Sequence, residues 1–208
     1  MKLQIKYNVS NLKEALTIAE QTAEFADILE VGSLLLFGNG IEAINAFKKR
    51  FPEKPIYADA KISSRGEESV KLFAATGLQY LSVLAGTYHS IIQAATKTAS
   101  SYKIKIVLDF INSHSLGQSA MEAKTLGAHA ILLHRSILSE ENDEFLNQWQ
   151  EVRANTDLPI FIKGRMSKKI IVNLLPLKPQ GFVAGRSIVK ASNPRQEAKE
   201  LYDLIKNT

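Results

Sequence analysis

The sequence contains no cysteine, which excludes disulfide frameworks, thiolate metal sites and cysteine nucleophiles. It also lacks any uncharged apolar run of about eighteen residues, so no segment is predicted to span a membrane. The N-terminal MKLQIKYNVS becomes polar too early for a secretory signal, and we expect a cytoplasmic protein. Linkers and low-complexity stretches are missing as well. The sequence therefore predicts a single domain over residues 1–208.

The charge balance is mildly basic, with 26 Lys and Arg against 21 Asp and Glu. Basic residues are interspersed with acidic ones, as where residues 48–50 (KKR) are followed by Glu53. A nucleic-acid module would more often show one basic stripe with interleaved aromatics. We therefore predict no nucleic-acid partner and no membrane partner.

Short apolar runs of strand length alternate with longer amphipathic stretches along the whole chain. Several runs are apolar nearly throughout, which is typical of parallel strands covered on both faces. No Gly-x-Gly-x-x-Gly follows the first run, which disfavours a dinucleotide-binding open sheet. Eight such runs favour a single-domain (β/α)8 TIM barrel of the α/β class. The runs are 3–7, 26–32, 55–62, 80–85, 103–111, 130–134, 158–163 and 181–185.

Helix boundary signals support this alternation. Ser10, with Glu14 a turn later, is expected to begin the first helix, and Asn193-Pro194 the last. Gly77 and Gly127 lie where glycine commonly ends a helix.

Polar residues lie where the expected strands end, which is where such barrels carry their chemistry. Asp59 and Lys61 are two residues apart and so are predicted to share one strand face, at least as a salt bridge. With Glu30 from the neighbouring strand, Asp59 can supply carboxylates for Mg²⁺. Lys61 can stabilise an enediolate oxyanion. For any one of these positions, the alternative is a charge that meets water where the loop begins.

His134 is one of four histidines and the one that ends an expected strand, with Arg135 behind it. An imidazole there suits proton transfer near neutral pH. The alternative is a histidine that bonds a loop carbonyl. The seventh and eighth strand ends, 162–165 (IKGR) and 184–187 (AGRS), are typical of phosphate sites, because glycine admits the oxyanion and arginine binds it.

Several of these segments resemble the orotidine 5′-monophosphate decarboxylase suprafamily. They are YADAKI around Asp59 and Lys61, LEVGSLLLFGNG upstream and AGRSI near the end. The similarity extends from residue 3 to the final helix and is best with the sugar-phosphate branch, 3-keto-L-gulonate 6-phosphate decarboxylase and 3-hexulose-6-phosphate synthase. LHRS at 133–136 resembles the decarboxylase, whereas DFIN at 109–112 resembles the synthase.

The resemblance implies a homodimer with active sites at the subunit interface and a phosphorylated sugar as substrate. It assigns Glu30 and Asp59 to Mg²⁺, Lys61 to the enediolate, and His134 and Arg135 to proton delivery. It further implies that Arg186 and Gly185, with the loop at Gly164 and Arg165, hold the phosphate, and that Asp109 is a substrate-site acid.

Three positions depart from the family pattern. The family motif Asp-x-Lys-x-x-Asp ends here in Ser64, the first strand ends in Asn8 instead of Asp, and Gly164-Arg165 replaces Gly-Gly. Loss of two carboxylates removes acceptors at the substrate-binding positions Asn8 and Ser64 and alters the charge around Lys61. These departures predict either a different substrate or an impaired activity.

Four hypotheses follow. The first is a Mg²⁺-dependent lyase on a phosphorylated ketose, most like the ketogulonate-phosphate decarboxylase. The second is the synthase, in which the enediolate of ribulose 5-phosphate attacks formaldehyde. The third is a catalytically degenerate homologue that binds a sugar phosphate, and the fourth is a pentose-phosphate isomerase or epimerase.

Overall fold

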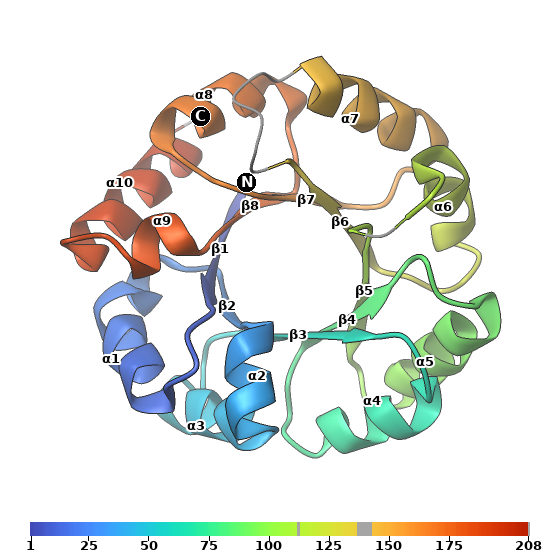
Figure 1. The fold of residues 1–208 in the computed structure, drawn as a ribbon, viewed down its shortest axis with the longest axis horizontal. Coiled ribbons are helices and arrows are strands. Elements are labelled where there is room, and N and C mark those ends of the chain that lie inside the picture. The colour runs from blue at the N-terminus through green and yellow to red at the C-terminus, as the bar shows by residue number, and fades with distance from the viewer. Residues whose placement is uncertain (112, 137–142, 208) are drawn as a thin grey trace.

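The computed structural model, which describes residues 1–111, 113–136 and 143–207, is a closed barrel of parallel strands. The strands pair in sequence order from β1 to β8, and β8 pairs back with β1. Figure 1 shows the strands as an inner ring and the helices as an outer one. The prediction of a (β/α)8 barrel is confirmed.

The eight strands formed by the described residues are short. They are β1 (Lys2–Tyr7), β2 (Ile28–Val31), β3 (Ile56–Ile62), β4 (Tyr80–Leu84), β5 (Lys105–Asp109), β6 (Ala130–His134), β7 (Ile160–Lys163) and β8 (Gly181–Ala184).

The helices cover the outside of the barrel. They are α1 (Leu12–Thr22), α2 (Ser33–Asn39), α3 (Glu42–Arg50), α4 (Gly66–Ala74), α5 (His89–Ser101), α6 (Leu116–Ala123), α7 (Asp143–Asn155), α8 (Lys168–Leu174), α9 (Arg186–Val189) and α10 (Pro194–Lys206), with 3-10 turns η1 (Ala23–Phe25) and η2 (Leu175–Leu177). Within the residues that the structure describes, no helix is both long enough and apolar enough to cross a membrane.

The helix signals are mostly confirmed. Asn193 caps α10 by accepting a hydrogen bond from the Gln196 amide, and Gly77 and Gly127 have positive φ after α4 and α6. The first cap was wrong by one residue. The Asn11 side chain, not Ser10, accepts from the Glu14 amide, because the helix begins at Leu12.

The barrel interior has an apolar layer with a charged layer above it. The apolar layer is a separate buried cluster formed by Ile28, Tyr57, Val107, Ala130, Leu132, Phe161 and Val183. Side chains alternate between the two faces of a strand, so residues two positions further along also face inward. On β2, β3, β5 and β7 these residues are Glu30, Asp59, Asp109 and Lys163. The strand period thus places charged groups at the carboxyl end of the barrel, above an apolar layer.

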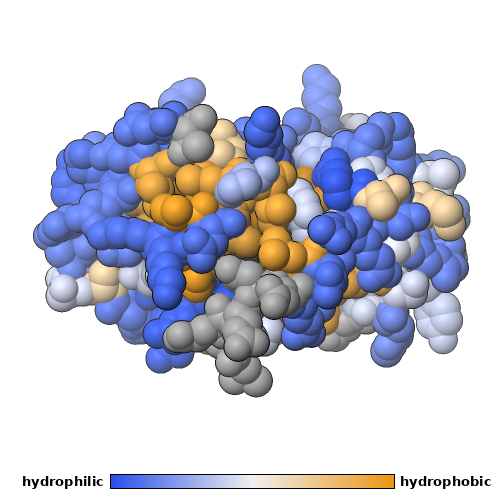
Figure 2. All heavy atoms as spheres, turned by 90° about the horizontal axis from the view of Figure 1, so that it is seen from above, coloured by the Kyte–Doolittle hydropathy of each residue, from blue (hydrophilic) through white to orange (hydrophobic). Residues whose placement is uncertain are grey.

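One side of the helical ring exposes apolar atoms. Figure 2 looks onto the side where α7 and α8 lie and shows apolar side chains gathered at its centre within a hydrophilic surround. Val172 on α8 is 49% exposed.

Candidate functional site: a buried ion network at the carboxyl end of the barrel

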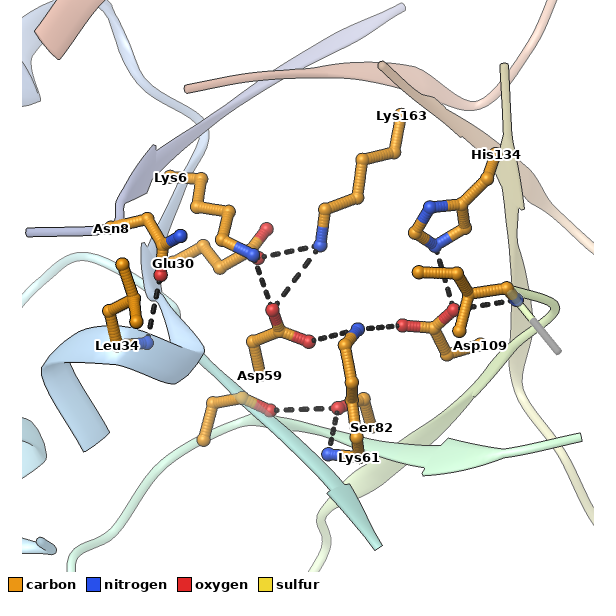
Figure 3. A network of polar contacts seen from close by, with 12 residues as sticks. Lys6, Asn8, Glu30, Leu34, Asp59, Lys61, Ser82, Asp109, His134 and Lys163 are labelled. Atoms are coloured by element: carbon orange, nitrogen blue, oxygen red, sulfur yellow. Dashed lines mark hydrogen bonds and ion pairs between the residues drawn. The ribbon is translucent and has the colours of Figure 1, made fainter. Parts of the chain in front are cut away.

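Three buried carboxylates and three ammonium groups form one connected network inside the barrel mouth (Figure 3). Each carboxylate contacts at least one lysine, so burial of its charge is offset by a charge of opposite sign. The carboxylates are at most 1% exposed. The network consists of Glu30, Asp59, Asp109, Lys6, Lys61 and Lys163.

Lys61 lies between two of these carboxylates. Its Nζ is 2.9 Å from Asp59 Oδ1 and also contacts Asp109 Oδ2, while His134 Nε2 lies 2.7 Å from Asp109 Oδ1. Burial alone would raise the pKa of Asp109, but the close contact and charge of His134, with the charge of Lys61, lower it to about 2. Asp109 is therefore ionised and holds both the lysine and the histidine toward the cavity.

The backbone of Lys61 is itself unusual. Its φ is +49°, and the pairing of β3 with β4 shifts register between Ala58 and Ile62. The Lys61 amide donates to Ser82 Oγ at 2.9 Å instead of to a strand carbonyl. A positive φ in a residue other than glycine is uncommon and costly, and such strained residues cluster in turns and at active sites. The predicted meeting of Asp59 and Lys61 occurs, but on an irregular strand and not through regular alternation.

Lys6 and Lys163 connect the other two carboxylates. Lys163 Nζ is 3.2 Å from Glu30 Oε1 and 3.4 Å from Asp59 Oδ2. Lys6 Nζ is 3.4 Å from the same Glu30 oxygen and also contacts Asp59 Oδ2. Gln4 Nε2 donates to the second oxygen of Glu30. Lys61 donates to Oδ1 of Asp59. Every carboxylate oxygen of Glu30 and Asp59 therefore already contacts an N–H donor.

These contacts set the protonation states. Burial would raise the pKa of Asp59, but the charges of Lys163, Lys6 and Lys61 outweigh burial and lower it. Burial would lower the pKa of Lys163, yet the charges of Glu30, Asp59 and Asp109 raise it. Asp59 is thus charged and Lys163 is a cation at neutral pH.

The residues present do not fit the Mg²⁺ that the family resemblance implies at Glu30 and Asp59. Among the described residues, no group of three or more Asp, Glu or His side chains is arranged to hold a metal. Two unit charges 4 Å apart interact by about 4 kcal/mol at an effective dielectric near 20, so each ammonium would repel a divalent ion by about twice that. The expected carboxylate pair is present, but lysines already serve as its cations.

A cavity of about 780 Å³ opens above the network. No Asp or Glu is among the described residues that line it, so its wall is cationic and the acids lie beneath as counterions. The basic residues in its lining are Lys6, Lys61, His134, Arg135, Lys163, Arg186 and Lys190. Of the expected site residues, Asn8, Lys61, His134, Arg135, Gly164, Gly185 and Arg186 lie in this wall.

Two expected substrate residues lie elsewhere. Arg165 is exposed and does not line this cavity. Ser64 lines a second cavity of about 470 Å³ between α2 and α4, and Lys61 is the one described residue that borders both cavities. Neither residue faces the ion network.

Asn8, which replaces the family carboxylate, has a structural contact. Its Oδ1 accepts from the Leu34 amide at 2.9 Å and so serves the first turn of α2. A Cβ on Gly32 would come within 2.5 Å of that oxygen, so glycine is needed for this approach. The side-chain amide N–H groups of Asn8 remain for a ligand in the cavity.

Gly164 allows β7 to pass close to the end of β6. A Cβ at this position would be 3.0 Å from the Arg135 carbonyl oxygen and 3.2 Å from the Arg135 Cβ. Arg135 is 4% exposed, and its amide donates to the Lys163 carbonyl at 2.7 Å. Glycine therefore lets the two strand ends and their basic side chains share one wall.

Sequence reasoning missed Lys6 as a site residue and placed Lys163 only within the expected phosphate segment 162–165. Lys6 follows Gln4 by two positions in an otherwise apolar strand, and that inward-facing period was the available signal. Ser82, which positions Lys61, gave no comparable signal, because a lone serine in an apolar strand is common.

Comparison with known proteins identifies the family. The family described as "Orotidine 5'-phosphate decarboxylase / HUMPS family" matches residues 1–201. The chain belongs to this family. Within the OMPdecase/HUMPS family it resembles the sugar-phosphate branch, as the following relatives show.

Two curated relatives and one solved structure align along nearly their whole length. A 3-hexulose-6-phosphate synthase of Mycobacterium gastri is 29% identical over 97% of this chain and 98% of its own. A probable 3-keto-L-gulonate-6-phosphate decarboxylase of Mycoplasma pneumoniae is 26% identical over 97% of this chain and 94% of its own. A crystal structure of 3-hexulose-6-phosphate synthase superposes with a TM-score of 0.91 at 28% identity, covering 99% of this chain and all of the other.

Proposed function

We propose that this OMPdecase/HUMPS protein makes or breaks a carbon–carbon bond in a phosphorylated ketose through an enediolate. The observation that carries the proposal is the cationic cavity above the connected Asp59, Lys61, Asp109 and His134 side chains. Fixed positive groups at a desolvated site favour a transition state in which negative charge develops on oxygen.

The wall opposite the carboxylates suits the phosphate. Arg186 and Gly185 after β8 and Gly164 after β7 border the cavity on the same side. Arginine can bind phosphate oxygens in a bidentate manner, and glycine leaves room for their approach. A ketose phosphate held there extends its carbonyl toward Lys61.

We assign the proton transfers to His134. In the synthase reaction, a base removes a proton from C1 of ribulose 5-phosphate, and the resulting enediolate carbon attacks formaldehyde. The new alkoxide then takes up a proton, so His134 would first accept a proton and later return one. Asp109 holds the imidazole at 2.7 Å and Lys61 faces the enediolate oxygen.

The synthase reaction is the first candidate, since the Mycobacterium gastri relative bears that name and aligns throughout. The decarboxylase, our first choice from the sequence, is the second, supported by the Mycoplasma pneumoniae relative. There, loss of CO₂ from the β-keto acid leaves the enediolate, which His134 helps to protonate.

Assays of the purified protein separate these candidates. Formaldehyde with ribulose 5-phosphate tests the synthase, and release of CO₂ from 3-keto-L-gulonate 6-phosphate tests the decarboxylase. Conversion of ribulose 5-phosphate to another pentose phosphate with uptake of solvent deuterium on carbon, and no turnover in either assay, would favour an isomerase or epimerase. Absence of both turnover and deuterium uptake would contradict the enzymatic proposal.

A sugar-phosphate-binding protein without turnover is the remaining candidate, favoured by Asn8 and Ser64. It predicts thermal stabilisation by phosphosugars with no product. The double variant Asn8→Asp with Ser64→Asp restores the family's carboxylates. Activity that appears only in this variant would identify a decayed enzyme.

We also propose a homodimer that forms through the α2–α4 surface. Phe37 is 81% exposed and Leu72 55% exposed, and both line the second cavity beside Ser64. Large exposed apolar side chains that line one cavity are typical of an interaction surface. The position of Lys61 between the two cavities would place this interface beside the active site. Light scattering should show a dimer for the wild type and a monomer for Phe37→Glu; a monomeric wild type would contradict the proposal.

A further inference from the structure

Two lysine ammonium groups occupy the position between Glu30 and Asp59 where a bound cation would neutralise both acids. Lys163 Nζ lies within 3.4 Å of one oxygen from each carboxylate, and Lys6 Nζ contacts the same two oxygens (Figure 3). Lys163 extends from β7, across the barrel from β3, and Lys6 extends from β1, which pairs with β2. Their side chains are 11% and 12% exposed, so both lysines are largely withdrawn from water.

The charges balance without a metal. Glu30, Asp59 and Asp109 carry three negative charges, and the three lysines that contact them carry three positive ones. Mg²⁺ needs near-octahedral oxygen coordination at about 2.0–2.1 Å. To reach these oxygens it would have to displace both ammonium groups toward the cavity wall, where no Asp or Glu is present among the described residues to pair with them.

Both lysines also border the cavity in which a ligand would bind. Lys6 and Lys163 line the cavity while contacting the acids beneath it. An ammonium group has three N–H donors, and each of these lysines contacts two carboxylates. One donor on each lysine is therefore left to bind an oxygen of a ligand above.

We propose that Lys6 and Lys163 replace the divalent cation of this site, so that the protein binds an oxyanion-bearing sugar phosphate without metal. In the bound complex, the two lysines contact the oxygens at the carbonyl or enediolate end of the substrate, because the phosphate is assigned to the Arg186 side. The identity of the ligand in this inference rests on the proposed function, whereas the exclusion of metal is independent of it.

Metal binding tests the exclusion directly and needs no substrate. Mn²⁺ titrated into the wild-type protein, followed by electron paramagnetic resonance, should give the spectrum of the free ion at all ratios. Stoichiometric binding that Glu30→Gln abolishes would overturn the proposal. The double variant Lys6→Ala with Lys163→Ala uncovers both carboxylates and should gain Mn²⁺ binding; if it does not fold, the wild-type titration still decides.

Ligand binding tests the second half. Calorimetry with ribulose 5-phosphate should give the same Kd in millimolar Mg²⁺ and in EDTA. Lys163→Gln should raise Kd by about tenfold or more, equivalent to ~1.4 kcal/mol. Lys169→Gln, which removes an exposed charge outside the cavity, should leave Kd unchanged. A Kd that requires Mg²⁺, or that Lys163→Gln does not alter, would contradict the proposal. Absence of turnover alone would count only against the proposed reaction.

Discussion

The Lys163 ammonium group lies 3.2 Å from the Glu30 carboxylate, although 133 residues separate them in the chain. β2 and β7 are not neighbours in the sheet, so this contact crosses the barrel interior. It forms only when the barrel is closed, because an open sheet would hold the two strands apart. The ion network is therefore a product of closure as much as of the residues in it.

Removal of the Glu30 charge should destabilise the protein strongly. Glu30→Gln keeps the side-chain shape but leaves Lys6 and Lys163 with one buried counterion fewer. Breaking a buried ion pair from one side costs about 3 kcal/mol or more, and urea unfolding should show a loss of that order. Glu67→Gln, from the solvent-exposed pair with Lys71, is the control and should leave the unfolding midpoint unchanged. Equal effects of the two variants would contradict the buried network.

Asp109 should affect turnover more than substrate affinity. Asp109→Asn removes the charge that holds both Lys61 and His134. Since a positioned acid–base group contributes about 10²-fold or more, kcat should fall by roughly that factor while KM changes little. Steady-state kinetics with the substrate that the assays identify would measure this. The exposed Asp157→Asn is the matched control and should behave as wild type.

Two arginines near the expected phosphate site should differ sharply. Arg186 lines the cavity, whereas Arg165 is exposed outside it. Arg186→Gln should weaken ribulose 5-phosphate binding by about tenfold or more, because a charged hydrogen bond to phosphate is lost. Arg165→Gln should leave the affinity unchanged. Calorimetry on both variants checks the assignment, and a larger effect at Arg165 would reverse it.

Acid should destabilise the network within a definite pH range. The pKa of Asp109 is lowered from 3.8 to about 2 in the folded protein, so its contribution is fully present above about pH 4. That contribution, roughly 2 kcal/mol, is lost as the pH falls through about 2. As the pH is lowered from about 5 to about 2, the free energy of unfolding should therefore fall less steeply for Asp109→Asn than for wild type. Parallel curves would contradict an ionised, ion-paired Asp109.

Much of the fold was determined by local sequence pattern. The eight apolar runs predicted eight strands, because parallel strands buried on both faces require nearly continuous apolar sequence. Strand length and period also placed Glu30, Asp59, Asp109 and His134 at the carboxyl end of the barrel. The Asn11 cap was missed, because Ser10 and Asn11 are adjacent and both cap well.

Only the tertiary structure decided what those side chains contact. The sequence offered Glu30 and Asp59 as a metal pair, and it showed Lys6 as one more residue of the first strand. Barrel closure brings β1, β2, β3 and β7 around one axis, so that lysines from two of these strands reach carboxylates from the other two. Charge partners across the barrel are set by this convergence and not by spacing along the chain. Local pattern thus fixed the strands and their ends, and packing in three dimensions fixed the partners and the cationic wall above them.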